Sequence, residues 1–223
     1  IGIHIHNWRS NGTIIRGTNG YSNGIVPFLK IYNSTMIAFN QGGRRPGSAA
    51  IYLMPHHPDI EAFLKLRLPT GIESERAREL FYAVWIPNIF MERVRDGGKW
   101  SLFDPDYCGD LSDYYDSKQE KSYTNRYLEL ENQKKYKKQI AARDLWELVV
   151  EANKIKGAVY ICFSDWVNQM SMQQNVGVIK SSNLCVSGDT LILTDKGYVD
   201  IKTLANTNRG KHIIWNGYAF KNA

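Results

Sequence analysis

The chain has 223 residues, 43% of them hydrophobic and 22% charged, which is ordinary for a soluble globular protein. Its length suffices for one large domain, or for one domain and part of another. No apolar run is long enough to cross a membrane, so a membrane protein is not expected. Three widely spaced cysteines give neither a disulfide framework nor a metal-type pairing, which favours a reducing, cytoplasmic setting and no bound metal.

The net charge of +6 favours an anionic ligand or partner, although a solvated basic surface is the commoner cause of so small an excess. Much of this charge lies in the Lys-Lys-Tyr-Lys-Lys run at 134–138, which is predicted to be an exposed stretch between helices. Because no array of aromatic and basic residues accompanies the run, direct binding of nucleic acid is not expected.

The beginning of the chain reads as a strand followed by a glycine-rich loop. Residues 1–8 alternate like a strand already under way, so the start is interpreted as a cut through a domain or as a trimmed chain. Four glycines among Asn, Ser and Thr at 9–24 predict an irregular loop with free backbone N–H groups. Arg9 and Arg16 flank this loop, and guanidinium groups with backbone donors suit phosphate. A surface loop without a ligand is the plainer interpretation.

A second glycine loop follows one helix later. Apolar residues recur at helical spacing from 25 to 39, and the segment 40–47 then carries Gln41, Gly42, Gly43, Arg44 and Arg45 before a Pro-Gly stop. Two glycine loops with arginines, joined by one helix, point to a ligand more strongly than either loop alone.

The rest of the first 184 residues alternates between strands and helices, which indicates an α/β domain. Strands are predicted at 49–53, 81–86, 100–103 and 158–163 (the last of a central type), helices at 59–66, 73–78, 88–95 and 140–155, and one long exposed helix at 111–138. Within this pattern Cys162 is interpreted as a small core residue, Cys108 as a loop residue without a partner, and Asp165 as a turn residue.

The sequence pattern changes at Cys185, because only strands and turns, and no helix, are predicted after it. Short strands are expected at 190–194, 197–201 and 213–220, and Asn216-Gly217 is a strong hairpin signal. A change of fold class is therefore placed at or near Cys185.

A series of short motifs runs along the chain in a fixed order. The motifs are Gly17-Thr18-Asn19-Gly20, Ser22-Asn23-Gly24, Gln41-Gly42-Gly43, Arg45-Pro46-Gly47, Ala50-Ile51-Tyr52-Leu53, Glu75-Arg76-Ala77-Arg78, Phe81-Tyr82-Ala83, Trp85-Ile86-Pro87, Gln173-Gln174-Asn175 and Ser182-Asn183-Leu184-Cys185. In their order and spacing, residues 1–184 resemble the middle of the catalytic subunit of class I ribonucleotide reductase, of the eukaryotic and large-virus kind. The resemblance implies part of a ten-stranded α/β barrel with a finger loop inside it.

The resemblance also implies site residues. Asn183 would hydrogen-bond the substrate ribose, and the cysteine after Leu184, here Cys185, would abstract the 3′ hydrogen as a thiyl radical. Arg9, Arg16 and Gly17 match the family's contacts to an effector nucleoside triphosphate. The segment Gln41, Gly42, Gly43, Arg44 and Arg45 matches the one that relays effector identity to the substrate base, although it is one residue shorter than usual.

The implied partners follow from the same family. They are a ribonucleoside diphosphate substrate, deoxynucleotide or ATP effectors, a metal-containing small subunit that supplies the radical, a second large subunit, and thioredoxin or glutaredoxin as reductant. No cofactor is expected on this chain itself. The cysteine pair that delivers electrons in the family falls outside the chain, so the chain alone is expected to be inactive.

One departure from the family dominates. The family continues Leu-Cys with Thr-Glu, whose Glu is the general base, whereas Val186-Ser187-Gly188-Asp189-Thr190 follows here. Cys-x-x-Gly-Asp-Thr, an apolar strand and then Gly197 resemble the first block of an intein. This predicts a reductase barrel segment at 1–184 and an all-β, Hint-type intein start at 185–223. The Cys185 thiol would attack the Leu184 carbonyl in an N-to-S acyl shift. A divergent reductase segment is the alternative.

Three functions therefore remain in competition. The first is ribonucleotide reduction under nucleotide control, the second is protein splicing that begins at Cys185, and the third is a nucleotide-binding module without catalysis.

Overall fold

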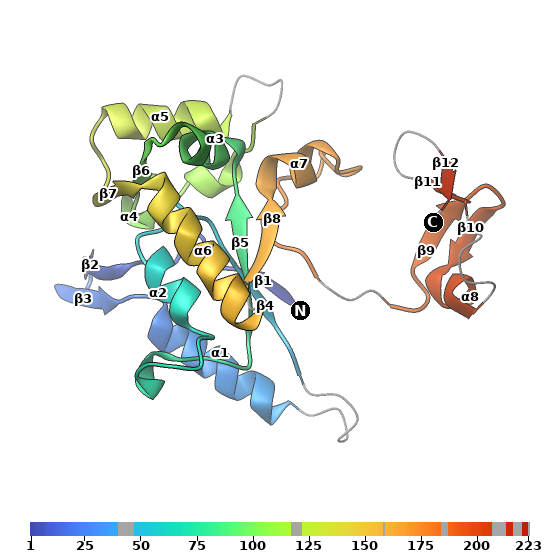
Figure 1. Ribbon diagram of the computed structural model, residues 1–223, viewed down its shortest axis with the longest axis horizontal. Coiled ribbons are helices and arrows are strands. Elements are labelled where there is room, and N and C mark those ends of the chain that lie inside the picture. The colour runs from blue at the N-terminus through green and yellow to red at the C-terminus, as the bar shows by residue number, and fades with distance from the viewer. Residues whose placement is uncertain are drawn as a thin grey trace. The chain divides into compact units, whose positions relative to one another are not determined.

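The computed structural model describes residues 1–39, 47–116, 122–157, 159–183, 187–206, 213–215 and 220–222. The chain divides into two compact units, Ile1–Ser182 and Asn183–Ala223 (Figure 1). None of the helices in the described ranges is long and apolar enough to cross a membrane.

The first unit is built on a four-stranded sheet in the order β1-β4-β5-β8. All three pairings are parallel, and the strands are β1 (Gly2–His4), β4 (Ala50–Leu53), β5 (Phe81–Ile86) and β8 (Val159–Phe163). Parallel neighbours need crossover connections, and helices supply them here. The predicted α/β class is therefore confirmed, with a parallel sheet at its centre.

Helices fill each crossover of this sheet. They are α1 (Val26–Ala38) between β1 and β4, α2 (Ile60–Lys65) between β4 and β5, and α3 (Asn88–Asp96), α4 (Pro105–Cys108), α5 (Tyr123–Asn132) and α6 (Ala142–Lys156) between β5 and β8, with α7 (Ser164–Gln169) following. Helix α6 packs against α2 and α3 (Figure 1). A two-stranded antiparallel sheet of β6 (Lys99–Leu102) and β7 (Lys138–Ala141) completes the unit.

The core lies on both faces of the parallel sheet. Tyr82 of β5 packs edge-on against Phe63 of α2, with ring centroids 5.0 Å apart. Tyr52 of β4 packs against Trp85 on the opposite face, because successive strand residues alternate in direction. The prediction that β8 is a central-type strand is wrong within the described residues, since it lies at the end of the sheet with Tyr160, Ile161 and Phe163 exposed.

The glycine-rich segment after β1 forms a hairpin, so the predicted irregular loop at 9–24 is wrong. Strand β2 (Asn11–Ile15) pairs antiparallel with β3 (Gly20–Asn23). The β-branched run Thr13-Ile14-Ile15 favours a strand, and the ladder uses backbone groups that glycine also carries. A bulge between Asn11 and Ile14 absorbs the irregularity.

One carboxylate fastens the base of this hairpin to the body of the unit. The Asp59 side chain accepts hydrogen bonds from the backbone N–H of Asn11 at 3.1 Å and of Ile25 at 3.2 Å. Between them Gly24 has φ +76°, and a Cβ there would lie 2.5 Å from Asp59 Oδ2. Only glycine fits this position without strain.

The long exposed helix predicted at 111–138 is also wrong. The segment contains a 3₁₀ turn at Leu111–Asp113, helix α5 and the beginning of β7, and residues 117–121 lie outside the described residues. The Ser122 side chain caps α5 by accepting from Asn125 N at 3.1 Å.

Helix α5 is not exposed, because it buries one face of aromatic side chains. Tyr123, Tyr127 and Leu130 are fully buried, and Tyr127 stacks on Trp100 of β6 at 4.4 Å. The helix ends at Asn132, and Lys134 just beyond it has a left-handed φ of 54°. Lys135 N donates to Leu130 O at 3.1 Å, which closes the end of the helix.

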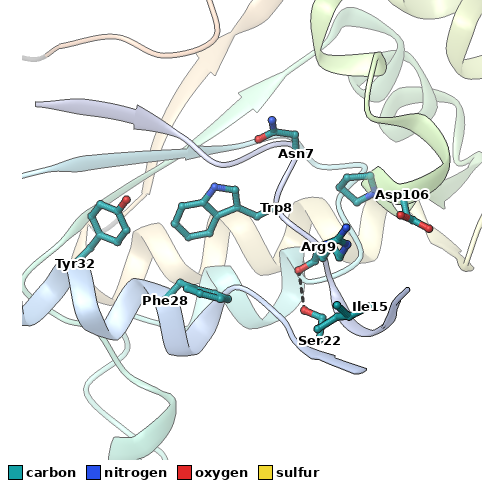
Figure 2. A pocket seen from close by; sticks show the side chains of 9 residues that line it. Asn7, Trp8, Arg9, Ile15, Ser22, Phe28, Tyr32 and Asp106 are labelled. Carbon is teal, nitrogen blue, oxygen red and sulfur yellow. Dashed lines mark hydrogen bonds between the residues drawn. The ribbon is translucent and has the colours of Figure 1, made fainter. Parts of the chain in front are cut away.

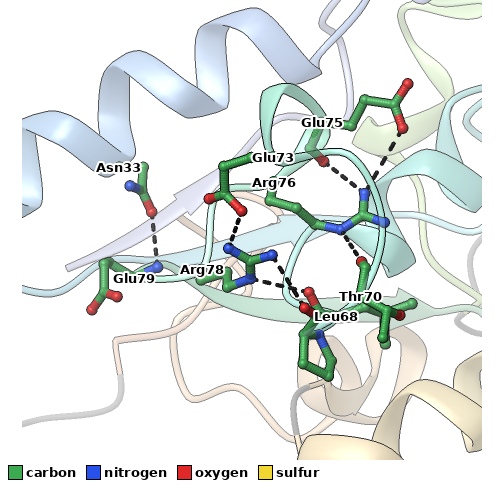
Figure 3. A network of polar contacts seen from close by, with 9 residues as sticks. Asn33, Leu68, Thr70, Glu73, Glu75, Arg76, Arg78 and Glu79 are labelled. Atoms are coloured by element: carbon green, nitrogen blue, oxygen red, sulfur yellow. Dashed lines mark hydrogen bonds and ion pairs between the residues drawn. The ribbon is translucent and has the colours of Figure 1, made fainter.

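The helix predicted at 73–78 is only a 3₁₀ turn at Glu73–Glu75, and arginine side chains hold the rest of this segment by hydrogen bonds (Figure 3). Arg76 Nε donates to the Thr70 carbonyl at 2.8 Å, and Arg78 Nε donates to the Leu68 carbonyl at 3.1 Å. These side chains hold the connection between α2 and β5 in place of a regular helix.

Three single-residue interpretations also change or sharpen. Cys108 lies at the end of α4 rather than in a loop, and burial raises the pKa of its thiol to about 12. Asp165 lies in the first turn of α7, where it accepts from Asn88 N at 2.6 Å and Asp116 N at 2.7 Å. Cys162 is only partly buried, although it packs against the core.

The second unit is a small antiparallel sheet in the order β10-β9-β11-β12. Its strands are β9 (Leu191–Thr194), β10 (Gly197–Asp200), β11 (Ile213–Trp215) and β12 (Phe220–Asn222). Helix α8 (Ile201–Asn206) follows β10, so the expectation of no helix after Cys185 is wrong. Asn216 and Gly217 lie outside the described residues, but β11 and β12 pair antiparallel, as the predicted hairpin requires.

Candidate functional site

A cavity of about 570 Å³ lies where the chain leaves the parallel sheet beyond β1 (Figure 2). Its aromatic wall consists of Trp8, Phe28 and Tyr32, with the Trp8 ring centroid 5.7 Å from that of Phe28 and 5.8 Å from that of Tyr32. Its lining residues are Asn7, Trp8, Arg9, Ile15, Ser22, Phe28, Tyr32, Pro105 and Asp106. Ligands of α/β proteins bind beyond the carboxyl ends of the strands, so the position suits a site.

The predicted site residue Arg9 lines this cavity. Its backbone carbonyl accepts from Ser22 Oγ at 3.5 Å, and Ser22 Oγ in turn accepts from Gly24 N at 3.1 Å. These contacts tie the main chain at Arg9 to strand β3. The guanidinium is exposed and has no acidic partner within the ranges that the structure describes.

A second cavity of about 660 Å³ opens on Arg16. Basic side chains predominate in its lining over two aspartates. Tyr21 and Tyr107 join Tyr136 of the lysine run there. Its lining residues are Gly12, Thr13, Ile14, Arg16, Tyr21, Asp104, Asp106, Tyr107, Lys134, Lys135, Tyr136 and Lys137. Sequence reasoning missed this combination because the hairpin, α4 and the lysine run are far apart in the chain and meet only in the fold.

Asp106 lies between the two cavities and holds Arg16. Arg16 Nη2 lies 2.9 Å from Asp106 Oδ2, and Asp106 contributes to the lining of both cavities. The Arg16 side chain is 78% exposed, whereas that of Asp106 is 19% exposed. No sequence signal identified Asp106 as a site residue.

Asp104 joins helix α4 to the hairpin from a buried position. Its carboxylate accepts from the hydroxyls of Ser10 and Thr13 and, at 3.0 Å, from Asp106 N. Burial alone would raise the pKa of Asp104, but the two hydroxyls and the amide hold it below its usual value. The carboxylate is therefore ionised at neutral pH and fixes α4 against β2.

Gly17, the third predicted effector contact, lies in the turn between β2 and β3. No heavy atom outside its neighbours approaches within 4 Å of the place where a Cβ would stand. The backbone of this turn is therefore open to a ligand.

The structure does not test the remaining predicted site residues. Asn183 is exposed and begins the second unit, and Cys185 lies outside the described residues together with Gln41, Gly42, Gly43, Arg44 and Arg45. Their predicted roles stay predictions.

The segment that leads toward Asn183 is fastened from two sides. Asn168 of α7 accepts from Ile179 N at 2.7 Å and donates to Ile179 O at 3.0 Å. His6 Nε2 donates to the Lys180 carbonyl at 2.9 Å, which leaves the buried Nδ1 as an acceptor without a partner among the described residues. Burial lowers the pKa of His6 well below its usual value, so the ring is neutral. Sequence reasoning gave no sign of either residue.

The described residues contain no set of side chains suited to a metal ion. Among the residues with described positions, no group of three or more His, Cys, Asp or Glu side chains could hold an ion.

The parallel sheet and its helical crossovers define an α/β protein, and the cavity beyond β1 is a candidate ligand site at the carboxyl end of a strand. The family model described as ribonucleotide reductase, barrel domain, matches residues 1–206. The chain therefore belongs to the ribonucleotide reductase barrel-domain family.

Curated relatives carry the name ribonucleoside-diphosphate reductase large subunit. The vaccinia virus protein is 42% identical over 221 residues, which cover 99% of this chain and 28% of that protein. The Arabidopsis thaliana protein is 47% identical over 186 residues, 83% of this chain and 22% of that protein, and the Trypanosoma brucei protein is 46% identical over the same shares. The chain spans about a quarter of the length of these relatives.

Proposed function

We propose that this chain is part of the large subunit of a ribonucleoside-diphosphate reductase, an oxidoreductase that makes deoxyribonucleotides for DNA synthesis by thiyl-radical chemistry. The observation that carries the proposal is the family match over residues 1–206, together with 42–47% identity to relatives of that name.

In this function Asn183 orients a ribose hydroxyl, and a cysteine next to Leu184 abstracts the 3′ hydrogen. A neutral amide can bind a hydroxyl without adding charge to the site. Asn168 and His6 are positioning residues, because they hold the backbone at 179–180 just before Asn183. A radical must be kept close to the sugar and away from water, which a fastened loop favours.

The cavity beyond β1 suits a deoxynucleoside triphosphate or ATP as effector. Arg9 lines this cavity, Arg16 lines the second cavity, and Gly17 follows Arg16 in an open turn. Together they offer charge and backbone donors to the phosphates. The wall of Trp8, Phe28 and Tyr32 offers aromatic faces to a base. Residues 41–45 would carry the identity of the effector to the substrate.

Partners follow from the same proposal. The outer face of α1 leaves Phe28, Ile31 and Ile37 more than half exposed, and it adjoins the effector cavity. A second large subunit is the proposed occupant of this face, which would place the effector at a dimer interface. A metal-containing small subunit would supply the radical, thioredoxin or glutaredoxin the electrons, and the cytoplasm is the proposed location.

The test is reduction of a ribonucleoside diphosphate by the complete large subunit with its small subunit and a dithiol. Deoxynucleotide formation is expected, and Asn183→Ala should abolish it while effector binding persists. Arg9→Ala should weaken effector binding, whereas Arg95→Ala, which removes a surface arginine paired with Asp96, should not. Absence of turnover by the wild type with every diphosphate would overturn the proposal.

A second function, protein splicing beginning at Cys185, is favoured by the organisation of the chain. A separate compact unit begins at Asn183, and its described strands form an antiparallel sheet unlike the parallel sheet before it. The 186-residue matches to the plant and trypanosome proteins stop short of the full chain. The family match to residue 206 and the 221-residue poxvirus match favour the alternative, an uninterrupted reductase segment.

The complete reading frame distinguishes these alternatives. Splicing predicts that expression yields a joined reductase and a separate excised protein, and that Cys185→Ala in the precursor leaves the two fused. Cys162→Ala is the matched control and should leave excision unchanged. A mature subunit that retains residues 186–206, found by peptide mass analysis, would exclude an intein.

A further inference from the structure

We propose that Asp106 is an internal anion that competes with the effector's phosphates for Arg16, and so sets the affinity of the effector site. The inference rests on the proposed effector role of the cavity beyond β1. It concerns the regulation of that site by a residue of its own wall.

Asp106 is held in place, whereas Arg16 is free to leave. Asp106 follows Pro105 in the first turn of α4, and its N–H donates to Asp104 Oδ1 at 3.0 Å. Asp104 is itself buried and bound to Ser10 and Thr13 beside the hairpin. The Arg16 side chain is 78% exposed, so breaking the pair moves the guanidinium and not the carboxylate.

The pair keeps Arg16 away from the predicted ligand. Arg9 lines the first cavity and Arg16 lines the second, while Asp106 lines both. A triphosphate bound beside Arg9 therefore gains a contact with Arg16 only if the guanidinium turns from the Asp106 carboxylate to the phosphate. Phosphate oxygens carry more charge than one carboxylate and accept bidentate bonds from a guanidinium, so the exchange favours the bound effector.

The competition lowers affinity by a modest factor. An exposed ion pair shifts an equilibrium by about 1.4- to 5-fold, because solvent screens both charges. Replacing Asp106 with neutral, isosteric asparagine should therefore tighten effector binding by a factor of about 2 to 5. The gain should require Arg16.

The experiment is equilibrium binding of dTTP to the complete large subunit in four forms: wild type, Asp106→Asn, Arg16→Ala and the double variant. Asp106→Asn should bind about 2- to 5-fold more tightly and Arg16→Ala more weakly. The double variant should match Arg16→Ala. Asp96→Asn, which removes the same charge from an exposed pair with Arg95, is the matched control and should bind like wild type.

Three results would overturn the proposal. Unchanged affinity of Asp106→Asn would show that the pair does not compete, while a normal loss in Arg9→Ala would leave the effector assignment standing. A gain that persists in the double variant would show that Asp106 acts by general repulsion and not through Arg16. Failure of the wild type to bind dTTP would remove the effector assignment and this inference together.

Discussion

The parallel sheet and the β2–β3 hairpin are held by different forces. Every residue of β4 is buried, and β5 buries all but Phe81 between aromatic and aliphatic neighbours. The hairpin buries only Thr13 and Ser22 among its strand residues, and carboxylates fasten it to the rest of the unit. Asp59 binds its base, and Asp104, which caps α4, binds the buried Thr13 of β2.

This difference separates stability from function within one unit. Apolar burial of the sheet supplies most of the free energy of folding, because that energy scales with the area removed from water. The hydrogen bonds of Asp59 and Asp104 contribute less to the free energy of folding, but they fix the orientation of the hairpin. They therefore determine where Arg9, Arg16 and Asp106 lie. Changes in the sheet should unfold the unit, whereas changes in the anchors should loosen the site and leave the sheet intact.

The largest effect is expected from Tyr82 in the middle of the sheet. Its ring is 1% exposed and packs on Phe63, and its hydroxyl donates to the Ala77 carbonyl at 2.6 Å. Tyr82→Ala should lower the free energy of unfolding by about 3–5 kcal/mol, as aromatic-to-alanine changes in cores do. Tyr82→Phe, which loses only the hydrogen bond, should cost about 1 kcal/mol in the same denaturant titration. Equal losses would mean that packing does not dominate.

Sequence reasoning succeeded where side-chain periodicity and burial coincide. The apolar runs at 49–53 and 81–86 became β4 and β5, and the spaced apolar residues at 25–39 became α1. It failed at 9–24 because four glycines outweighed the short β-branched run Thr13-Ile14-Ile15, although a hairpin ladder uses backbone groups that glycine also carries. It failed at 111–138 because tertiary structure overrides the helix propensity of the lysines there. Lys134 adopts a left-handed conformation, and Lys138 pairs with β6 as the first residue of β7.

The site was only half visible in the sequence. Arg9, Arg16 and Gly17 stand in one motif, and the fold places all three around the hairpin. Asp106 was invisible because its role depends on α4 packing against the hairpin across about ninety positions, a separation that no local pattern encodes. The same holds for Asn168 and His6, which act on the backbone before Asn183.

An intermediate effect is expected from acid at His56, which is buried beyond β4 against Tyr123 of α5. Burial, with a smaller contribution from the charge of His57, lowers the pKa of His56 to about 3. Below pH 6.5 His56 therefore binds a proton in the unfolded chain but stays neutral in the folded chain. The free energy of unfolding falls as the pH drops from 6.5 toward 3. At pH 5 this one residue should cost about 2 kcal/mol.

The measurement is the free energy of unfolding between pH 7.5 and 5, a range in which ordinary carboxylates stay ionised. His56→Asn keeps an acceptor for the Tyr123 hydroxyl, which lies 2.8 Å from His56 Nδ1, but it cannot titrate. Its profile should be flatter than that of the wild type. Parallel profiles would show that His56 takes up its proton in the folded state.

The smallest effect on stability is expected from a change at Asp59. It also gives the sharpest test of the difference between the apolar sheet and the hairpin held by carboxylates. Asp59→Asn keeps the shape but turns one of two acceptor oxygens into a donor that faces the N–H groups of Asn11 and Ile25. The loss should be about 1 kcal/mol. Hydrogen exchange should accelerate at those two amides and remain slow at Val84 in β5, because only the hairpin base opens. Asp96→Asn, at an exposed surface pair, should change neither. If Val84 exchanged faster in step with Asn11, the hairpin and the sheet would be one cooperative unit, and the separation of anchoring from stability would not hold.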